Sequence, residues 1–214
     1  MRIHSDGWPF IAISIALNGL LFALAGWYGL ILVPLTVWCI AFFRDPERRA
    51  PPGDGLIVSP ADGVMLPVVE VPPPAELGMG PAPRPRLSIF MNVFNVHVNR
   101  VPDDAAVAAL AYRPGKFFNA SFDKASEHNE RMAMRFRLKN GQDLAVAQIA
   151  GLVARRIRCD LVQGQEVRRG ARFGIIRFGS RLDVYLPEGA TIRVTKGERV
   201  TAGETVLAEL ARLP

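Results

Sequence analysis

Polar and apolar residues alternate along several short segments in the second half of the chain. Leu182, Val184 and Leu186 fall on one side of such a segment, while polar or amphipathic residues lie between them. A period of two is typical of a β-strand. Asn140-Gly141 predicts a two-residue hairpin, and helix is expected only over 102–111 and 121–130. Further strand-like segments, separated by turn signals, are expected at 87–91, 132–138, 144–149, 174–178 and 191–194.

A long apolar run without any charged side chain covers residues 8–43. At 1.5 Å per residue, one straight helix of this length would extend about 54 Å, well beyond a hydrocarbon core of about 30 Å. A Gly-Trp-Tyr-Gly sequence at 26–29 supplies turn-permissive glycines and interfacial aromatic rings. The run therefore predicts a membrane hairpin of two helices, 9–25 and 29–43. A re-entrant or interfacial pair of helices is the alternative.

The residues after the apolar run indicate where the rest of the chain lies. Arg44, Arg48 and Arg49 follow it directly, and basic residues beside a membrane segment favour the cytoplasmic side. A secretory signal peptide would need a shorter apolar core and small residues at a cleavage site. We therefore expect residues 1–43 to attach a domain, 44–214, to the cytoplasmic face of the inner membrane.

The domain at 44–214 carries the chain's whole net charge of +6, with 25 basic and 19 acidic residues. This excess favours an anionic membrane surface, at about 1 kcal/mol per well-placed basic residue. The basic residues are scattered, with neither an aromatic-interleaved stripe nor a helix-turn-helix pattern, so nucleic acid is not an expected partner. Cys39 and Cys159 are isolated and lack metal-ligand spacing, which suits a reducing compartment and predicts no metal.

One seven-residue pattern occurs twice. Gly-x-x-Val-x-x-Gly at 164–170 matches 197–203 at an offset of 33 residues. This pattern suits a tight turn between short strands, as in biotinyl and lipoyl carrier barrels. The expected fold class is therefore mainly β (α+β): a barrel-like or sandwich-like β domain with biotinyl-like hairpins behind a helical membrane hairpin. The repeat indicates either pseudo-symmetry, with the segment 177–186 between its copies, or merely two similar hairpins.

Gly179-Ser180 interrupts the alternating segment 177–186. A glycine inside a strand pattern often marks a bulge or a close approach to the backbone. A serine hydroxyl beside such a peptide could attack the Gly179 carbonyl, which would cut the chain and create a new group at position 180. The alternative is a bulge followed by a surface serine.

Two side chains are candidate partners for Ser180. His97 ends an apolar segment; a lone histidine is often structural, yet its pKa range makes it the natural proton carrier near neutral pH. Asp62 lies in Ser-Pro-Ala-Asp-Gly at 59–63. It is either a turn carboxylate or the group that orients an imidazole, as the third member of a triad does.

Taken in order, these motifs resemble the phosphatidylserine decarboxylase family, and more closely its short bacterial and archaeal-like branch. The similarity runs from about Phe42 to the C-terminus. It is carried by the segments 59–63, 94–100, 114–117, 129–131 and 178–180, behind an apolar run that ends Phe-Phe-Arg-Asp-Pro-Glu-Arg at 42–48.

The resemblance implies a proenzyme that cleaves itself between Gly179 and Ser180, assisted by Asp62 and His97. The products would be a large chain, 1–179, and a small chain, 180–214, which form a heterodimer and could dimerise further. Residue 180 would become a covalent pyruvoyl group, which forms a Schiff base with the substrate amine, so neither a metal nor pyridoxal phosphate is needed. The implied reaction converts phosphatidylserine to phosphatidylethanolamine and CO₂.

One position departs from the family pattern. Many longer members carry two histidines three residues apart, whereas Arg100 stands at the second place here. Arg100 is expected to contact the substrate phosphate, and Lys116 and Phe117 to hold the lipid headgroup. The competing hypothesis is a non-enzymatic, membrane-anchored adaptor with a biotinyl-like or lipoyl-like barrel, in which Gly179-Ser180 is only a bulge.

Overall fold

The computed structural model describes residues 2–115, 129–151, 157–177 and 180–211. The chain divides into two compact units. The first holds residues 1–47 with 94–96, and the second holds 48–93 with 97–214.

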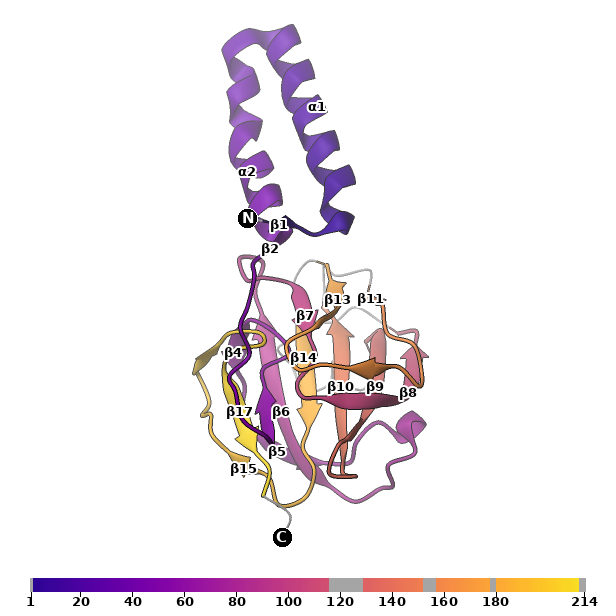
Figure 1. Ribbon diagram of the computed structural model, residues 1–214. Coiled ribbons are helices and arrows are strands. Elements are labelled where there is room, and N and C mark those ends of the chain that lie inside the picture. Colours follow the sequence, from indigo (N-terminus) through magenta and orange to yellow (C-terminus); the bar gives the residue numbers. More distant parts are fainter. Residues whose placement is uncertain (1, 116–128, 152–156, 178–179, 212–214) are drawn as a thin grey trace. The chain divides into compact units, whose positions relative to one another are not determined.

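The N-terminal unit is mainly helical. α1 (Trp8–Ala25) and α2 (Val33–Phe42) lie side by side (Figure 1), joined by the 3-10 segment η2 (Gly26–Leu32). Thr36 bonds Ser14 at 2.6 Å between their hydroxyls and also bonds Asn18. The short strands β1 (Arg2–Ile3) and β2 (Arg44–Asp45) pair at the base, where the 3-10 turn η1 (Ser5–Gly7) leads into α1.

The two helical stretches follow the expected positions closely. The second helix begins at Val33 rather than at residue 29, because the 3-10 segment takes up the residues after Gly26, whose φ is +57°. The apolar side chains of this unit are largely exposed, and the stretch Ser5–Phe42 is long and apolar enough to cross a membrane. Exposed apolar helices of this kind fit a lipid surrounding.

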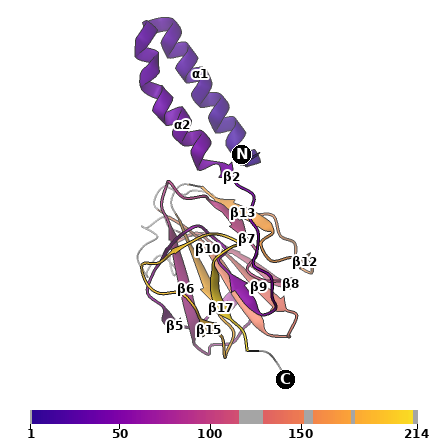
Figure 2. The same cartoon turned by 60° about the vertical axis from the view of Figure 1, so that its left-hand side comes forward.

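The second unit is built around an antiparallel sheet (Figures 1 and 2). Its strands run in the order β12 (Glu166–Val167), β8 (Ala105–Arg113), β9 (Arg131–Leu138), β10 (Asp143–Ala150), β14 (Ser180–Tyr185), β6 (Arg84–Met91), β4 (Gly63–Met65) and β16 (Arg199–Val200). β5 (Val69–Val71) also pairs with β6, and the 3-10 turn η3 (Ala75–Leu77) follows it.

Two three-stranded sheets complete this unit. One has the order β11 (Ile157–Cys159), β13 (Arg172–Ile176), β7 (Val98–Arg100); the other has β15 (Thr191–Ile192), β17 (Val206–Glu209), β3 (Leu56–Val58). The main apolar core includes Leu87, Phe136 and Leu182, and a smaller cluster includes Ile149 and Tyr185. Because β14 belongs to both clusters, all six of its residues are buried.

The mainly β prediction is confirmed, and so is the hairpin at Asn140-Gly141. β9 and β10 pair across it, the amide of Gly141 donates to the carbonyl of Leu138 at 2.9 Å, and Gly141 has a φ of +80°. Within the described residues the strands form an open sheet with two smaller sheets, and no closed barrel is present.

The helix expected at 102–111 is wrong, because that region contains β8. Its alanines favour a helix in isolation, but pairing with β9 along its length and burial of Ala105 and Val107 override that preference. The second expected helix, 121–130, lies mostly outside the described residues.

The repeated glycine pattern marks a structural duplication. β12 pairs with the start of β8 in the first copy, and β16 pairs with β4 in the second. The two copies therefore provide the two ends of the sheet order. The hydrogen bonds correspond as well. The amide of Gly170 donates to the carbonyl of Val101 at 2.8 Å, and the amide of Gly203 donates to that of Ser59 at 2.7 Å.

Candidate active site

Ser180 is the first residue of β14 and is fully buried. It pairs with Ala150 of β10 on one side and with Met91 of β6 on the other. Its hydroxyl lies 3.7 Å from the sulfur of Met91. A small carbonyl group fits this position, because the surroundings of the hydroxyl include a neutral thioether and its backbone is fixed from both sides.

Asp62 lies near the same end of the sheet. It directly precedes β4, in which Val64 pairs with Phe90, so the register continues to Gly63 opposite Met91. Met91 in turn pairs with Ser180. Two strand spacings, about 10 Å, thus separate the backbone of residue 63 from that of Ser180.

The carboxylate of Asp62 is fixed by two donors. The backbone amide of Ala202 donates to Oδ1 at 2.7 Å, and Arg48 Nη2 donates to Oδ2 at 3.0 Å. Arg48 also reaches Glu204 at 3.3 Å. We call Arg48, Asp62, Ala202 and Glu204 the Asp62 corner. Its carboxylate is held in one orientation and is only partly accessible, with 14% of the side chain exposed.

His97 is fully buried just before β7. The amide of Ile176 in β13 donates to the carbonyl of His97 at 3.4 Å, and β13 is the strand that precedes Ser180 along the chain. The amide of Arg100 donates to the carbonyl of Pro60 at 2.9 Å. β7 therefore connects the loop that carries Asp62 with the strand that leads to Ser180.

Arg100 is 4% exposed. Its Nη1 donates to the carbonyl of Gly170 at 2.8 Å. The aliphatic stem of Arg100 lies against Gly203. The contact of Arg100 with a phosphate stays a prediction.

A buried ion pair follows Ser180 directly. Arg181 donates to both carboxylate oxygens of Asp183, at 2.6 and 3.1 Å, and both side chains have no exposed surface. Arg86 of the neighbouring strand lies 3.8 Å from the same carboxylate. Burial, and secondarily the charge of Asp183, raises the pKa of Tyr185 to about 12. Removing either partner would leave an uncompensated charge in the interior. The intact ion pair therefore stabilises the start of β14.

Two buried amides were missed by the sequence reasoning. Asn99 of β7 and Gln148 of β10 are both fully buried, and Gln148 Nε2 donates to Asn99 Oδ1 at 2.8 Å. The Nδ2 atom of Asn99 lies 3.9 Å from the sulfur of Met91, which also contacts Ser180. Asn99 stands inside the segment 94–100 that carries the family resemblance, but no pattern in the sequence joins it to Gln148.

Three of the predicted residues lie outside the part of the chain that the structure describes. They are Gly179, Lys116 and Phe117. Ser180 and the loop with Asp62 lie at the same end of the main sheet, whereas His97 directly precedes β7 of a three-stranded sheet. The chemical roles of all three residues stay predictions.

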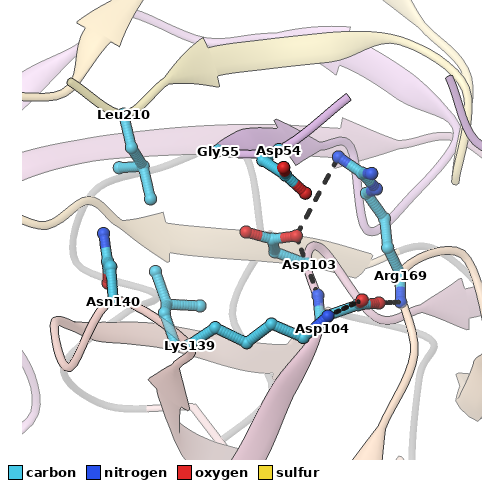
Figure 3. A pocket seen from close by; sticks show the side chains of 9 residues that line it. Asp54, Gly55, Asp103, Asp104, Lys139, Asn140, Arg169 and Leu210 are labelled. Carbon is cyan, nitrogen blue, oxygen red and sulfur yellow. Dashed lines mark hydrogen bonds and ion pairs between the residues drawn. The ribbon is translucent and has the colours of Figure 1, made fainter. Parts of the chain in front are cut away.

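The duplicated half contains a counterpart of the Asp62 corner. Asp104 lies 42 residues after Asp62, and the amide of Arg169 donates to Asp104 Oδ1 at 2.9 Å, as Ala202 does to Asp62. We call Asp103, Asp104, Lys139 and Arg169 the Asp104 corner (Figure 3). Lys139 lies 2.6 Å from Asp104, and Arg169 lies 3.9 Å from Asp103.

The pocket at the Asp104 corner differs from a ligand site. Its volume is about 140 Å³, below the roughly 300–1,000 Å³ of typical ligand pockets. The hydrogen bond from Lys139 is the main factor that lowers the pKa of Asp104, whereas burial raises the pKa of Asp103. The charges of this corner therefore compensate one another.

A buried serine at a strand start, a fixed carboxylate at the same end of the sheet and a buried histidine that precedes β7 define a candidate enzyme site. Comparison with known proteins identifies the group of enzymes. The sequence model of the phosphatidylserine decarboxylase family matches residues 35–208. The chain belongs to the phosphatidylserine decarboxylase family, and it is an enzyme.

Curated relatives agree over nearly the whole chain. A protein of Paramagnetospirillum magneticum is 55% identical over 211 residues, which cover 97% of this chain and 87% of the relative. A protein of Cereibacter sphaeroides is 57% identical, with 97% and 90% covered, and one of Rickettsia bellii is 50% identical, with 98% and 91% covered. Each of the three is named phosphatidylserine decarboxylase proenzyme.

Proposed function

We propose that this protein is a membrane-bound decarboxylase that converts phosphatidylserine to phosphatidylethanolamine and CO₂ after cutting itself between Gly179 and Ser180. The names of its relatives support the reaction. The observation that carries the proposal is the position of Ser180, a buried hydroxyl at the start of a strand held between β6 and β10.

The cleavage needs only groups of the chain and water. Ser180 Oγ gives up its proton and adds to the Gly179 carbonyl, so the amide becomes an ester. Loss of the Cα proton of residue 180 then expels the Gly179 carboxylate and leaves a dehydroalanine. Water hydrolyses its imine form and releases ammonia, which leaves a ketone on the new N-terminus. The products are residues 1–179 and 180–214, which stay together as a heterodimer.

Asp62 and His97 are the proposed assistants of this cleavage. His97 accepts and returns protons, because its ordinary pKa lies near neutral pH. Asp62, fixed by Arg48 and Ala202, would stabilise the positive form of the imidazole.

The decarboxylation that follows self-cleavage uses the pyruvoyl group at position 180 as its cofactor. The ketone of this group captures the substrate amine and accepts the electrons released when CO₂ leaves. His97 then supplies a proton to the carbon that has lost CO₂. Arg100, Lys116 and Phe117 are proposed to hold the lipid phosphate and the headgroup region.

Membrane attachment through the N-terminal helices brings the enzyme to its lipid substrate. The exposed apolar surface of α1 and α2 supports insertion, and Arg44, Arg48 and Arg49 support a cytoplasmic domain at the inner membrane. The remaining positive charge would favour anionic lipid.

The decisive experiment compares two serine-to-alanine variants of the full chain in detergent micelles. Ser180→Ala should leave one uncut and inactive chain of full mass. Ser88→Ala is the matched control, because Ser88 is also buried in the central sheet and pairs with Asp183 of the same strand, β14. This control should yield two fragments, the smaller of 35 residues without a free amino group and reactive with hydrazine.

Two outcomes would contradict the proposed function. A Ser180→Ala chain that is still cut would refute the cleavage mechanism. A wild-type chain that stays whole and has no decarboxylase activity would favour the adaptor hypothesis.

A further inference from the structure

We propose that Asn99 binds the carboxylate of the serine headgroup and that Gln148 is the positioning residue that orients it. This inference rests on the proposed function. It assigns the group that separates the substrate from the product, because phosphatidylserine and phosphatidylethanolamine differ only by that carboxylate.

Three strands bring the relevant groups together. Asn99 comes from β7, Gln148 from β10 and Ser180 from β14. The sulfur of Met91 lies 3.7 Å from Ser180 Oγ and 3.9 Å from Asn99 Nδ2. The amide of Asn99 and the hydroxyl of Ser180 therefore contact the same sulfur atom.

The orientation of the Asn99 amide follows from its partners. The carbonyl of Arg158 can only accept, and Gln148 Nε2 lies 3.5 Å from it. The same Nε2 donates to Asn99 Oδ1 at 2.8 Å. The opposite end of the Asn99 amide, its NH₂ group, is thereby directed toward the sulfur of Met91, which also contacts Ser180.

The pair is also incomplete as a hydrogen-bonded unit. Gln148 Oε1 is buried and has no hydrogen-bond partner within the described residues. Buried polar groups are normally paired, and an exception calls for an explanation such as a ligand that completes the set. An amino-acid headgroup supplies both kinds of partner, since its carboxylate accepts and its ammonium donates.

A neutral amide suits a carboxylate that must leave as CO₂. A close cation would stabilise the charged ground state and oppose its loss, because only interactions that are stronger in the transition state accelerate a reaction. The buried cation that follows Ser180 in the sequence, Arg181, is engaged by Asp183 through both carboxylate oxygens, and Arg100, which follows Asn99, donates to the carbonyl of Gly170. Asn99 can hold the carboxylate with a weaker, neutral bond.

The test uses the full chain in mixed micelles and measures cleavage, KM and kcat for phosphatidylserine, and inhibition by phosphatidylethanolamine. Asn99→Leu should be cut at a rate within about twofold of wild type. Its KM should rise about 10- to 100-fold, as expected for a lost hydrogen bond to a charged group, with kcat within about threefold. Inhibition by phosphatidylethanolamine should not change, because that lipid has no carboxylate.

Two further variants keep the test decisive if Asn99→Leu does not fold. Gln148→Leu should raise KM less than Asn99→Leu does, while Gln142→Leu, which removes an amide from the β9–β10 hairpin, should behave as wild type. Asn99→Asp places a carboxyl group at the site, which donates only when protonated. Its KM should therefore fall as the pH is lowered, a response that a structural role would not produce.

Several results would overturn the inference. A folded Asn99→Leu chain that stays uncut would assign Asn99 to cleavage, and an unchanged KM would remove it from substrate binding. A wild-type chain that is neither cut nor active would overturn the proposed function together with this inference, whereas a cut and active wild type with unaffected variants would overturn this inference alone.

Discussion

The Asp62 corner and the Asp104 corner share a hydrogen bond from a backbone amide to a carboxylate but differ in the side chains around it. In each, a carboxylate accepts the backbone amide that precedes the last glycine of the repeated pattern, at 2.7 Å from Ala202 and 2.9 Å from Arg169. Asp62 then meets Arg48, whereas Asp104 meets Lys139. The Asp104 side chain is 35% exposed and that of Asp62 only 14%.

The difference lies in the strands that adjoin each corner. β4, which follows Asp62, pairs with β6, the neighbour of Ser180. β8, which follows Asp104, pairs with β9, and β10 lies between β9 and the serine strand. One duplicated turn therefore lies two strand spacings from Ser180, and its copy lies three spacings from β14. Both carboxylates are ion-paired, so the chemical role proposed for Asp62 depends on its position relative to Ser180.

The largest expected difference between the two corners appears when the carboxylate of each is exchanged for an amide. Asp62→Asn keeps the acceptor for Ala202 but removes the negative charge, so self-cleavage should slow by about 100-fold or more. Asp104→Asn makes the same change in the copy and should leave the rate unchanged. The rates follow from denaturing gels after cell-free synthesis, with thermal unfolding to verify folding. Equal slowing in both variants would contradict the division of roles.

A smaller effect is expected from the last glycine of each copy. Gly203 and Gly170 have φ values of +75° and +76°, so alanine should destabilise each by about 1–2 kcal/mol. A Cβ at Gly203 would also lie 2.9 Å from Arg100 Cδ, whereas at Gly170 it would lie 3.3 Å from Ala50 Cβ. Denaturant unfolding should give similar losses for the two variants, and KM should change only in Gly203→Ala. A KM change of equal size in Gly170→Ala would argue against the proposed role of Arg100.

The smallest effect concerns acid. The hydrogen bond from Lys139 lowers the pKa of Asp104 in the folded protein. The ion pair therefore stabilises the folded protein fully above the unfolded pKa of Asp, about 3.9. This stabilisation is lost as the pH falls through the pKa of Asp104 in the folded protein. Because the pair is partly exposed, we expect Asp104→Asn to cost about 0.5–1 kcal/mol at pH 7. Urea unfolding at pH 7 and near pH 3 should show that cost shrinking in acid; a constant cost would exclude the ion pair as its source.

The sequence was most informative where a local pattern decided the structure. Alternation located β14, and Asn140-Gly141 located the hairpin, because both depend on neighbouring residues. The alanine-rich stretch that forms β8 misled the prediction, since its pairing with β9 depends on residues 18 to 33 positions away.

The candidate site was only partly predictable for the same reason. Ser180, His97 and Asp62 could be selected from residue type and motif. The amide pair could not, because Asn99 and Gln148 are 49 residues apart and meet only after β7 and β10 are assembled. The correspondence of Asp62 with Asp104 likewise emerges from hydrogen bonds, since the glycine pattern itself includes neither residue.

The placement of β14 has a consequence for what a backbone break would do. A scission before residue 180 would leave the six-residue strand clamped between β6 and β10, both belonging to the other fragment, while β17 remains paired with β3 of that fragment. The shorter fragment would stay bound, because strands of the longer fragment pair with β14 on both sides. Severing this chain would alter its chemistry at one point without dismantling the molecule.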